Sequence, residues 1–276
     1  MKTFMKWSGN KSRFIKYILP KIPQYNTYYE PFLGSGALFL SLAPQKWIIN
    51  DINPELCRVW QALMFNPGYF IKIFRHYAKI LSKLRKDDLL VECKTLTNNL
   101  NYTRQSIKRS VIYLMMKNLG YNGHIFFNDK FKFYTFDLNI HTYDNVFLFS
   151  KKYENNLHTV STYLQTGNNM ILNQNYTQVL RLCKAGDFVF LDPPYVEDHD
   201  YQFVYNKEER LDDGFLLTLL KEVKKLDKKR VKWLMTQADT PRIRQLFKDY
   251  NITEIPIYRM PKKQFVHELI IMNYKQ

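Results

Sequence analysis

Hydrophobic positions along this chain form short apolar runs that alternate with stretches of helical period. Near the start, strand-like runs at 27–30 and 47–50 flank a glycine-containing turn and an apolar helix at 37–43. The same alternation returns in the second half, where a strand at 187–191 precedes a helix at 212–226 with apolar residues at helical spacing. Strands that alternate with helices in this way predict an α/β fold with a largely parallel sheet.

The middle of the chain has a different character. Amphipathic helical stretches at 70–84 and 105–119 carry many lysines and arginines, and the aromatic-polar segment "NLGYNGHIFFNDKFKFYTF" follows them. Beyond a further strand at 231–236, the tail reads as two strands, 252–260 and 268–274, joined by a basic turn. The α/β core is therefore predicted to be split by an insertion of roughly a hundred residues.

The segment "EPFLGSG" follows the first predicted strand and opens a helix. Gly34 and Gly36 permit close approach of the backbone to a ligand, and the helix N-terminus offers free N–H groups. Asp51 stands at the end of the next strand, where an acid in a doubly wound sheet typically binds ribose hydroxyls. Together they indicate an adenosine-containing ligand, although an ordinary strand-to-helix turn is the alternative for the glycines alone.

A second motif, "DPPY", ends the predicted strand at 187–191. Asp192 is thereby placed at the crevice where open α/β sheets bind ligands. Pro193 and Pro194 have no N–H group and fix the backbone, so their carbonyl groups are oriented into the cleft. Asp192 and the Pro193 carbonyl provide two acceptors suited to an exocyclic amine, and Tyr195 offers a flat face to a base.

Charge and composition favour a polyanionic partner. Lysine and arginine outnumber aspartate and glutamate by 41 to 25, for a net charge of +16, and the excess is spread along the chain. Aromatic residues (20 Tyr, 20 Phe and 4 Trp) interleave with the lysines, as suits stacking on bases. An anionic membrane surface would also suit this charge, and a Lys-, Asn- and Tyr-rich composition can simply reflect an AT-rich genome.

Several protein classes are disfavoured. The first residues lack the apolar region of a secretory signal, and no apolar run approaches the roughly 18 residues of a membrane span. The three cysteines, Cys57, Cys93 and Cys183, are odd in number and lack metal-ligand spacing. We therefore expect a reduced, cytoplasmic protein that binds neither metal nor membrane.

In several segments the chain resembles the Dam-type (D12 class) DNA adenine-N6 methyltransferases of bacteria and phages. "KWSGNK" resembles their N-terminal element, "YEPFLGSG" their cofactor loop, "NDIN" their ribose-binding segment and "GDFVFLDPPY" their catalytic motif, in the same order. "LGYNG…NDK" is similar to the start of their DNA-reading region, and "LMTQAD" and "KKQFVHELIIMNY" to their closing strands. The matches span nearly the whole chain, with 60–110 and 140–170 alike in character only.

The resemblance implies a Rossmann-like methyltransferase fold that carries an inserted, mostly helical DNA-recognition domain. The catalytic domain would comprise 1–56 and 166–276, and the target-recognition domain 57–165. Its cofactor would be S-adenosyl-L-methionine, with S-adenosyl-L-homocysteine as the product, and Asp51 would hold the ribose while Ile52 packs on the cofactor adenine. The implied cofactor residues are Trp7, Lys11, Glu30, Phe32, Gly34, Ser35, Gly36, Asp51, Ile52, Asn175, Tyr176 and Asp192.

The same resemblance implies a reaction and a DNA surface. Asp192, Pro193, Pro194 and Tyr195 would hold a target adenine flipped out of double-stranded DNA, while its N6 accepts the methyl group. Lys6, Tyr121 and Asn122 would face DNA. Phe126, Lys130 and Lys132 are further candidate DNA-binding residues of this chain, and Lys6, Lys130 and Lys132 are the candidate readers of sequence. A partner restriction enzyme is compatible with the family, and so is a monomer acting on DNA; the oligomeric state stays open.

The chain departs from the members of this family that recognise GATC. They carry an arginine four residues after the asparagine of the YNG-like segment, where this chain has Phe126. The proline of their following "PFG" is absent from "TFD" at 135–137, and the basic loop around 261–263 is shortened. A bidentate arginine–guanine contact contributes about 1–3 kcal/mol of discrimination, which phenylalanine does not supply. The target is therefore predicted to differ from strict GATC.

Three other functions remain open at this point. Methylation of cytosine N4 uses the same chemistry but commonly places serine at the position of Asp192. RNA adenine methylation is a second alternative. The third is a catalytically silent DNA-binding protein on the same fold, which the intact glycine loop, Asp51 and DPPY motif disfavour.

Overall fold

The computed structural model describes residues 1–7, 9, 11–102, 106–128, 133–138, 150–195, 213–259 and 264–275. They form two compact units. The first comprises Met1–Ser12, Gly34–Ala43 and Asn53–Ile171, and the second comprises Arg13–Leu33, Pro44–Ile52 and Leu172–Gln276. The division into a catalytic and a target-recognition domain stays a prediction. None of the helices in the described ranges has the length and apolar character to span a bilayer.

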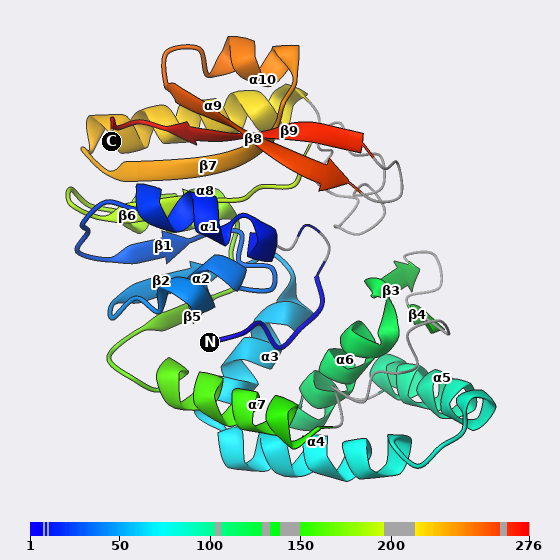
Figure 1. Ribbon diagram of the computed structural model, residues 1–276. Helices are drawn as coiled ribbons and strands as arrows, with labels where there is room; N and C mark the ends of the chain where they lie inside the picture. Colours follow the sequence, from blue (N-terminus) through cyan, green and yellow to red (C-terminus); the bar gives the residue numbers. More distant parts are fainter. Residues whose placement is uncertain are drawn as a thin grey trace. The chain divides into compact units, whose positions relative to one another are not determined.

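Six strands of the second unit, together with β5, form a seven-stranded sheet with the order β5-β2-β1-β6-β7-β9-β8 (Figure 1). Short apolar runs that end at polar or turn-forming residues make up its central strands, as their sequence predicts. The strands are β1 (Tyr28–Glu30), β2 (Trp47–Asn50), β5 (Met170–Leu172), β6 (Phe188–Leu191), β7 (Lys232–Ala238), β8 (Asn251–Arg259) and β9 (Gln264–Met272).

The direction of the strands defines where a ligand is expected. Strands β2, β1, β6 and β7 run parallel, whereas β9 runs antiparallel to both β7 and β8. From β1 the sheet grows through β2 on one side and through β6 and β7 on the other. The order therefore reverses between β1 and β6, and open α/β sheets bind ligands beyond the carboxyl ends of their strands at such a point. This architecture confirms the predicted α/β methyltransferase-like fold.

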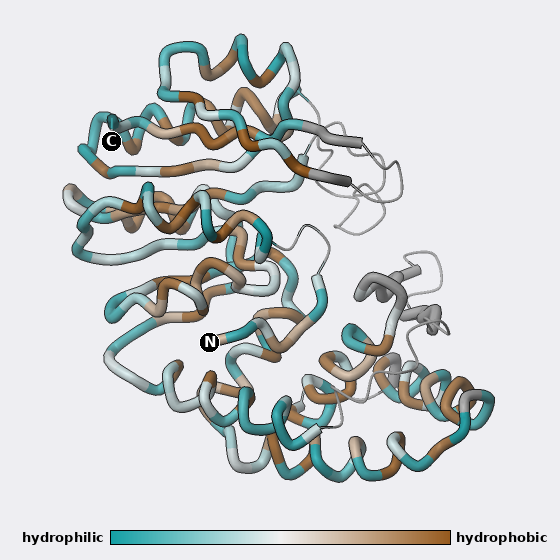
Figure 2. The backbone as a smooth tube through the Cα atoms, in the orientation of Figure 1, coloured by the Kyte–Doolittle hydropathy of each residue, from teal (hydrophilic) through white to brown (hydrophobic). Residues whose placement is uncertain are grey.

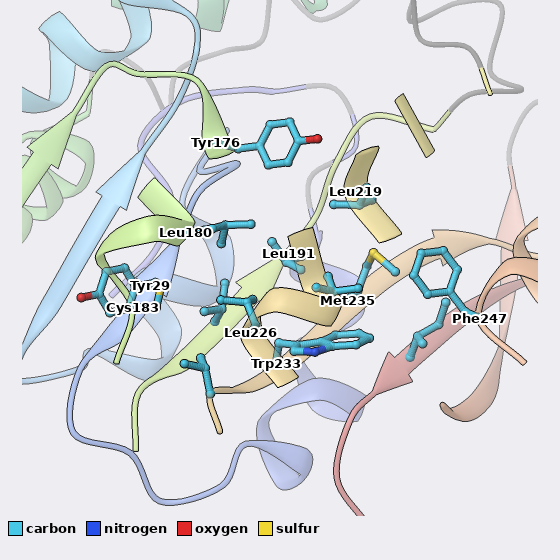
Figure 3. Close-up of a cluster of buried hydrophobic side chains, with 14 of the residues drawn as sticks. Tyr29, Tyr176, Leu180, Cys183, Leu191, Leu219, Leu226, Trp233, Met235 and Phe247 are labelled. Carbon is cyan, nitrogen blue, oxygen red and sulfur yellow. The ribbon is translucent and has the colours of Figure 1, made fainter. Parts of the chain in front are cut away.

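One face of this sheet is covered by α8 (Tyr176–Leu182), α9 (Asp213–Lys228) and α10 (Pro241–Leu246). Figure 3 shows side chains from α8, α9 and the strands filling the space between these layers. Alternate residues of β6 and β7 point into this core because side chains along a strand alternate between its two faces. The central members of the cluster are Tyr29, Leu180, Leu191, Leu219, Leu226, Trp233, Met235 and Phe247.

The first unit is mainly helical, as expected for the inserted segment. Its α3, α4, α6 and α7 pack against one another, while α5 packs against α6. Three of the helices described in this unit begin with a side-chain cap, since Asn53 accepts from the Leu56 N–H, Ser106 from the Arg109 N–H and Ser150 from the Tyr153 N–H. The helices are α2 (Ala37–Leu42), α3 (Pro54–Phe65), α4 (Pro67–Leu81), α5 (Lys86–Tyr102), α6 (Ile107–Leu119) and α7 (Lys151–Leu164).

The remaining short elements include a β-hairpin that hydrophobic periodicity did not predict. Strands β3 (Gly120–Asn128) and β4 (Phe133–Leu138) pair antiparallel, with an irregular register between Gly120 and Ile125. The aromatic-polar segment thus forms a two-stranded sheet that adjoins α6 and α5. Near the N-terminus lie the short helices η1 (Lys11–Arg13), α1 (Ile15–Ile18) and η2 (Leu19–Lys21).

The elements predicted from periodicity are confirmed with small shifts of their ends. The expected helices at 70–84, 105–119 and 212–226 correspond to α4, α6 and α9, and Figure 2 shows hydrophobic and hydrophilic residues alternating along α4 and α9. Short elements such as α8, α10 and β5 were not predicted, because they are too few residues long to show a clear period.

Candidate active site

The loop after β6 begins where the strand must end. Pro193 and Pro194 have no N–H group to continue the ladder with β7, so the chain leaves the sheet at Asp192. Pro193 and Tyr195 are buried, whereas Asp192 and Pro194 are half-buried. The predicted catalytic residues therefore lie at the carboxyl edge of β6, next to the reversal of strand order.

Two side chains from neighbouring strands hold this loop. The Thr236 hydroxyl donates to Oδ1 of Asp192 at 2.7 Å, and the Tyr195 hydroxyl donates to Oε2 of Glu268 at 2.8 Å. Burial, together with the negative charges of Glu268 and Asp192, raises the pKa of Tyr195 well above its usual range. The phenol of Tyr195 therefore stays protonated and acts as a donor throughout the physiological pH range.

Asn50 holds the loop that follows β1. This residue ends β2 and is only 1% exposed. Its Nδ2 donates to the carbonyls of Pro31 (2.9 Å) and Gln174 (3.0 Å), and its Oδ1 accepts from the Gln174 N–H at 2.9 Å. The Asn50 carbonyl accepts from the Leu33 N–H at 2.9 Å. Asn50 thus joins the loops after β1 and β5.

Asp51 and Ile52 follow Asn50 at the end of β2. Asn173 donates from Nδ2 to both of their carbonyls, at 2.9 Å for Asp51 and 3.0 Å for Ile52. Asp51 is buried, whereas Ile52 is 39% exposed. A carboxylate next to an accessible apolar side chain fits the ribose hydroxyls and the flat base of an adenosine group.

The other predicted cofactor residues of this unit lie close to these. The Phe32 ring contacts the Tyr176 ring at a centroid distance of 5.0 Å, so the loop after β1 meets the start of α8. Asn175 caps α8, since its Oδ1 accepts from the N–H (3.0 Å) and hydroxyl (2.9 Å) of Thr177. Asn175 therefore also stabilises the start of α8. Glu30 is buried and accepts from the Tyr28 hydroxyl at 2.6 Å.

In the first unit, Trp7 packs directly on Gly34. Gly34 has φ +50°, and a Cβ atom there would lie 2.9 Å from Cδ1 of Trp7, so only glycine fits without strain. The Nζ atom of Lys117 lies 4.2 Å from the centroid of the Trp7 ring on the α6 side. Lys11 is buried and donates to the Gly9 carbonyl, while Ser35 is buried and Gly36 precedes α2 in a left-handed conformation.

Two of the segments predicted to face DNA also meet in the first unit. Gly123 has φ +75°, and a Cβ atom there would lie 2.8 Å from the Lys6 carbonyl oxygen. The Lys6 N–H donates to Oδ1 of Asn118 at 3.0 Å, and partial burial lowers the pKa of Lys6. Tyr121 and Asn122 precede Gly123 in β3, so the structure brings Lys6 to the YNG-like segment.

Of the residues predicted to contact DNA in this region, Phe126 lies in the hairpin. Phe126 in β3 is the register partner of Thr135 in β4, so two of the departures from the GATC-reading pattern stand opposite each other. Lys130 and Lys132 lie outside the described residues, as does the shortened segment 261–263.

Sequence reasoning did not identify four of the side chains that build this site. Asn50, Asn173, Thr236 and Glu268 each bond to a predicted site residue or its loop. The available signal was positional, because Asn50 and Asn173 lie at or next to the end of a strand, while Thr236 and Glu268 lie within the resembling segments "LMTQAD" and "KKQFVHELIIMNY".

Two other groups of potentially reactive side chains carry no chemistry that we can assign. Asp239, Glu254 and His267 bring ligand atoms within 4.8 Å of one another, but Arg244 donates to both carboxylates, at 2.6 Å to Asp239 Oδ1 and 2.6 Å to Glu254 Oε1. This guanidinium already supplies the positive charge that a cation would bring.

The three cysteines are buried free thiols, and burial raises the pKa values of Cys93 and Cys183 to about 12.

Replacing Asn50 by alanine should destabilise the second unit. The change removes hydrogen bonds to the backbone of Pro31 and Gln174, and leaving such groups unpaired costs about 1–3 kcal/mol in the free energy of unfolding. Urea denaturation measures this loss. The exposed Asn155 provides a matched control, because its change to alanine should stay within about 0.5 kcal/mol of wild type. An Asn50 variant as stable as wild type would contradict the assigned role.

Comparison with known proteins places these features in context. The model of a family described as D12 class N6 adenine-specific DNA methyltransferase matches residues 7–259. The Type II methyltransferase M1.LlaDCHI of Lactococcus lactis subsp. cremoris is 27% identical over 99% of this chain and 96% of its own length. The DNA adenine methylase of Haemophilus influenzae is 22% identical over 97% of this chain and 92% of its own.

Solved structures add little to this. The solved structure of the putative methyltransferase yhhF from Escherichia coli aligns over 96% of this chain and 85% of the yhhF chain, with a TM-score of 0.38 and 12% sequence identity. A likeness of this degree carries no argument about function.

Proposed function

Because the chain belongs to the D12 class of N6 adenine-specific DNA methyltransferases, we propose that it uses S-adenosyl-L-methionine to methylate an adenine flipped out of double-stranded DNA. Its activity as an adenine-specific DNA methyltransferase follows from the family and from the relatives that match nearly its whole length. The cofactor, the form of the DNA and the role of each residue are the proposal. The observation that carries them is the loop Asp192–Tyr195, held at the reversal of strand order.

The residues at the ends of β1 and β2 fit the proposed cofactor. Asp51 offers a carboxylate for the ribose hydroxyls, and the accessible Ile52 side chain offers an apolar face for the adenine ring. Phe32 and Tyr176 form an aromatic pair beside them. When bound, S-adenosyl-L-methionine supplies an electrophilic methyl group on its sulfonium. The roles of Trp7, Lys11, Gly34, Ser35 and Gly36 rest on the family resemblance and stay predictions.

At the loop after β6, the chain's own groups orient the target amine. The carboxylate of Asp192, which accepts from Thr236, is proposed to accept one N–H of the adenine amine as well, while the Pro193 carbonyl accepts the other. These acceptors hold the nitrogen lone pair toward the methyl donor and stabilise the positive charge that develops on N6. Tyr195 stacks on the flipped base. Most of the rate enhancement then arises from orientation of two bound reactants.

Analysis of methylated nucleosides tests this function. The purified protein is incubated with S-adenosyl-L-methionine and, separately, with duplex DNA, single-stranded DNA or RNA, and the digested products are identified by mass spectrometry. N6-methyladenine formed mainly in the duplex is the expected result. N4-methylcytosine, or methylation confined to RNA, would replace the proposal by one of its alternatives.

The preferred DNA sequence should differ from strict GATC. Phe126 replaces the arginine of the GATC-reading members, and its register partner Thr135 replaces their proline. A phenylalanine can contact a thymine methyl or wedge into a base step, but it cannot form hydrogen bonds to guanine. Methylation of a randomised duplex library, followed by sequencing that detects N6-methyladenine, measures the preference. Modified adenines found almost only in GATC would show that another residue reads the guanine.

A further inference from the structure

We propose that Thr236 and Glu268 are positioning residues of the methyl-transfer reaction, which fix the carboxylate of Asp192 and the ring of Tyr195 in the orientations that the target adenine requires. The inference rests on the proposed roles of Asp192 and Tyr195. Thr236 and Glu268 lie in "LMTQAD" and "KKQFVHELIIMNY", two segments to which the family resemblance assigns no site residue in this chain.

Thr236 is fully buried and lies beside Asp192 because of strand register. Leu191 pairs with Met235 in the parallel ladder of β6 and β7, so the next residues, Asp192 and Thr236, are neighbours on the same face. The hydroxyl has one proton, and it donates this proton to Oδ1 of Asp192 at 2.7 Å. This hydrogen bond restrains rotation of the Asp192 carboxylate about its Cβ–Cγ bond and so favours one orientation of its two oxygens.

Glu268 anchors the far end of the Tyr195 side chain. Its carboxylate is 6% exposed and accepts from the phenolic hydroxyl at 2.8 Å. The Tyr195 ring is therefore held at two points, by its backbone and by its hydroxyl, and its plane cannot tilt freely. Burial, together with the charges of Glu268 and Asp192, raises the pKa of Tyr195, so the phenol keeps the proton that it donates to Glu268. A ring held in this way keeps one orientation, which is the property that stacking on a flipped base requires.

The antiparallel strand β9 explains how a residue so distant in sequence reaches the loop. It lies between β7 and β8, and its direction brings its beginning to the carboxyl edge of β7. Glu268 pairs with Ala238, and Ile270 pairs with Thr236, so both anchors lie along this edge. A strand in the parallel direction would have placed its end there instead of its beginning.

Single-turnover kinetics test the role of Thr236. Thr236→Val keeps the shape of the side chain and removes the donor, so methyl transfer should slow by about 10–100-fold, the effect of losing orientation at the reacting group. Binding of S-adenosyl-L-methionine, measured by calorimetry, should change little. Thr236→Ser keeps the hydroxyl and should restore most of the rate. Thr253→Val makes the same change on β8, at a half-buried threonine that is the register partner of Ile270, and should leave the rate unchanged.

A double-mutant cycle tests the role of Glu268. Glu268→Gln keeps an acceptor for the phenol and should retain most of the rate, whereas Glu268→Leu removes it and should slow methyl transfer. In a Tyr195→Phe background the Glu268→Leu change should have almost no further effect, because the hydroxyl that it holds is already absent. Fluorescence of 2-aminopurine at the target position reports whether the stacked base becomes more mobile in Glu268→Leu and Tyr195→Phe.

The outcomes separate this inference from the proposed function. If Thr236→Val methylates DNA at the wild-type rate while Asp192→Ala does not, the positioning role is wrong and the role of Asp192 stands. If Thr236→Ser is as slow as Thr236→Val, the effect comes from packing and the inference is overturned. If the losses of methyl-transfer rate caused by Glu268→Leu and Tyr195→Phe add up in the double variant, Glu268 does not act through the Tyr195 hydroxyl and its positioning role is overturned. Transfer that persists in Asp192→Ala refutes the proposed role of Asp192, on which this inference rests, whereas the nucleoside analysis decides the proposed function.

Discussion

Replacing Asp192 by alanine should abolish methyl transfer to adenine and leave the binding of S-adenosyl-L-methionine largely intact. Asp192 stands at the carboxyl end of β6, where Thr236 donates to Oδ1, and its carboxylate is the group proposed to meet the target amine. Loss of one preorganised polar group at a reacting centre typically lowers the turnover number by about 10²–10³-fold. Transfer of a tritiated methyl group to duplex DNA measures the loss, and calorimetry measures cofactor binding.

Two variants sharpen this test. Asp192→Asn keeps one acceptor oxygen and the shape of the side chain, so it should retain more activity than the alanine variant. Asp249→Ala removes an exposed carboxylate from the same unit and should methylate DNA like wild type. If the Asp192→Ala enzyme keeps more than about a tenth of wild-type turnover, the loss is smaller than removal of a reacting-centre contact predicts and the assigned role is wrong.

Replacing Glu55 by alanine should produce the largest loss of stability, about 3–5 kcal/mol in the free energy of unfolding, because it breaks a buried ion pair. Glu55 is 5% exposed and accepts from Nη2 of Arg109 at 2.8 Å and from Nη1 of Arg58 at 2.9 Å. The Arg109 side chain is 13% exposed and also donates to the Leu100 carbonyl. Without Glu55, the Arg109 guanidinium is desolvated and loses its counter-charge. Urea denaturation followed by far-ultraviolet circular dichroism measures the change.

An exposed pair of the same chemistry supplies the control. Arg242 bonds Asp213 through two nitrogens, at 2.6 Å each, but the two side chains are 39% and 55% exposed. Asp213→Ala should therefore lower the free energy of unfolding far less than Glu55→Ala does, since water screens an exposed pair. Equal losses for the Glu55 and Asp213 variants would show that burial does not decide the strength of these pairs.

Local patterns were sufficient for the elements that carry the chemistry. The apolar run 188–191 followed by two prolines predicts both strand β6 and its end at Asp192, because alternation, apolar runs and missing N–H groups are properties of adjacent residues. The family resemblance rests on motifs of this local kind, and the family match over 7–259 confirms it. The β3–β4 hairpin was missed because its aromatic and polar residues do not alternate regularly, and its register is irregular after Gly120.

By itself, the sequence determined the family, the fold class and the loops on which Asp51 and Asp192 lie. The tertiary structure alone decided which side chains support those loops. Thr236 is 44 residues from Asp192 and Glu268 is 73 from Tyr195, while Asn50 bonds Gln174 across 124 residues. Such pairs depend on strand order and register, above all on β9 entering the sheet antiparallel beside β7. Periodicity along a chain reports which face of a strand is buried but not which strand lies next to it, so these supporting residues become visible only in the folded sheet.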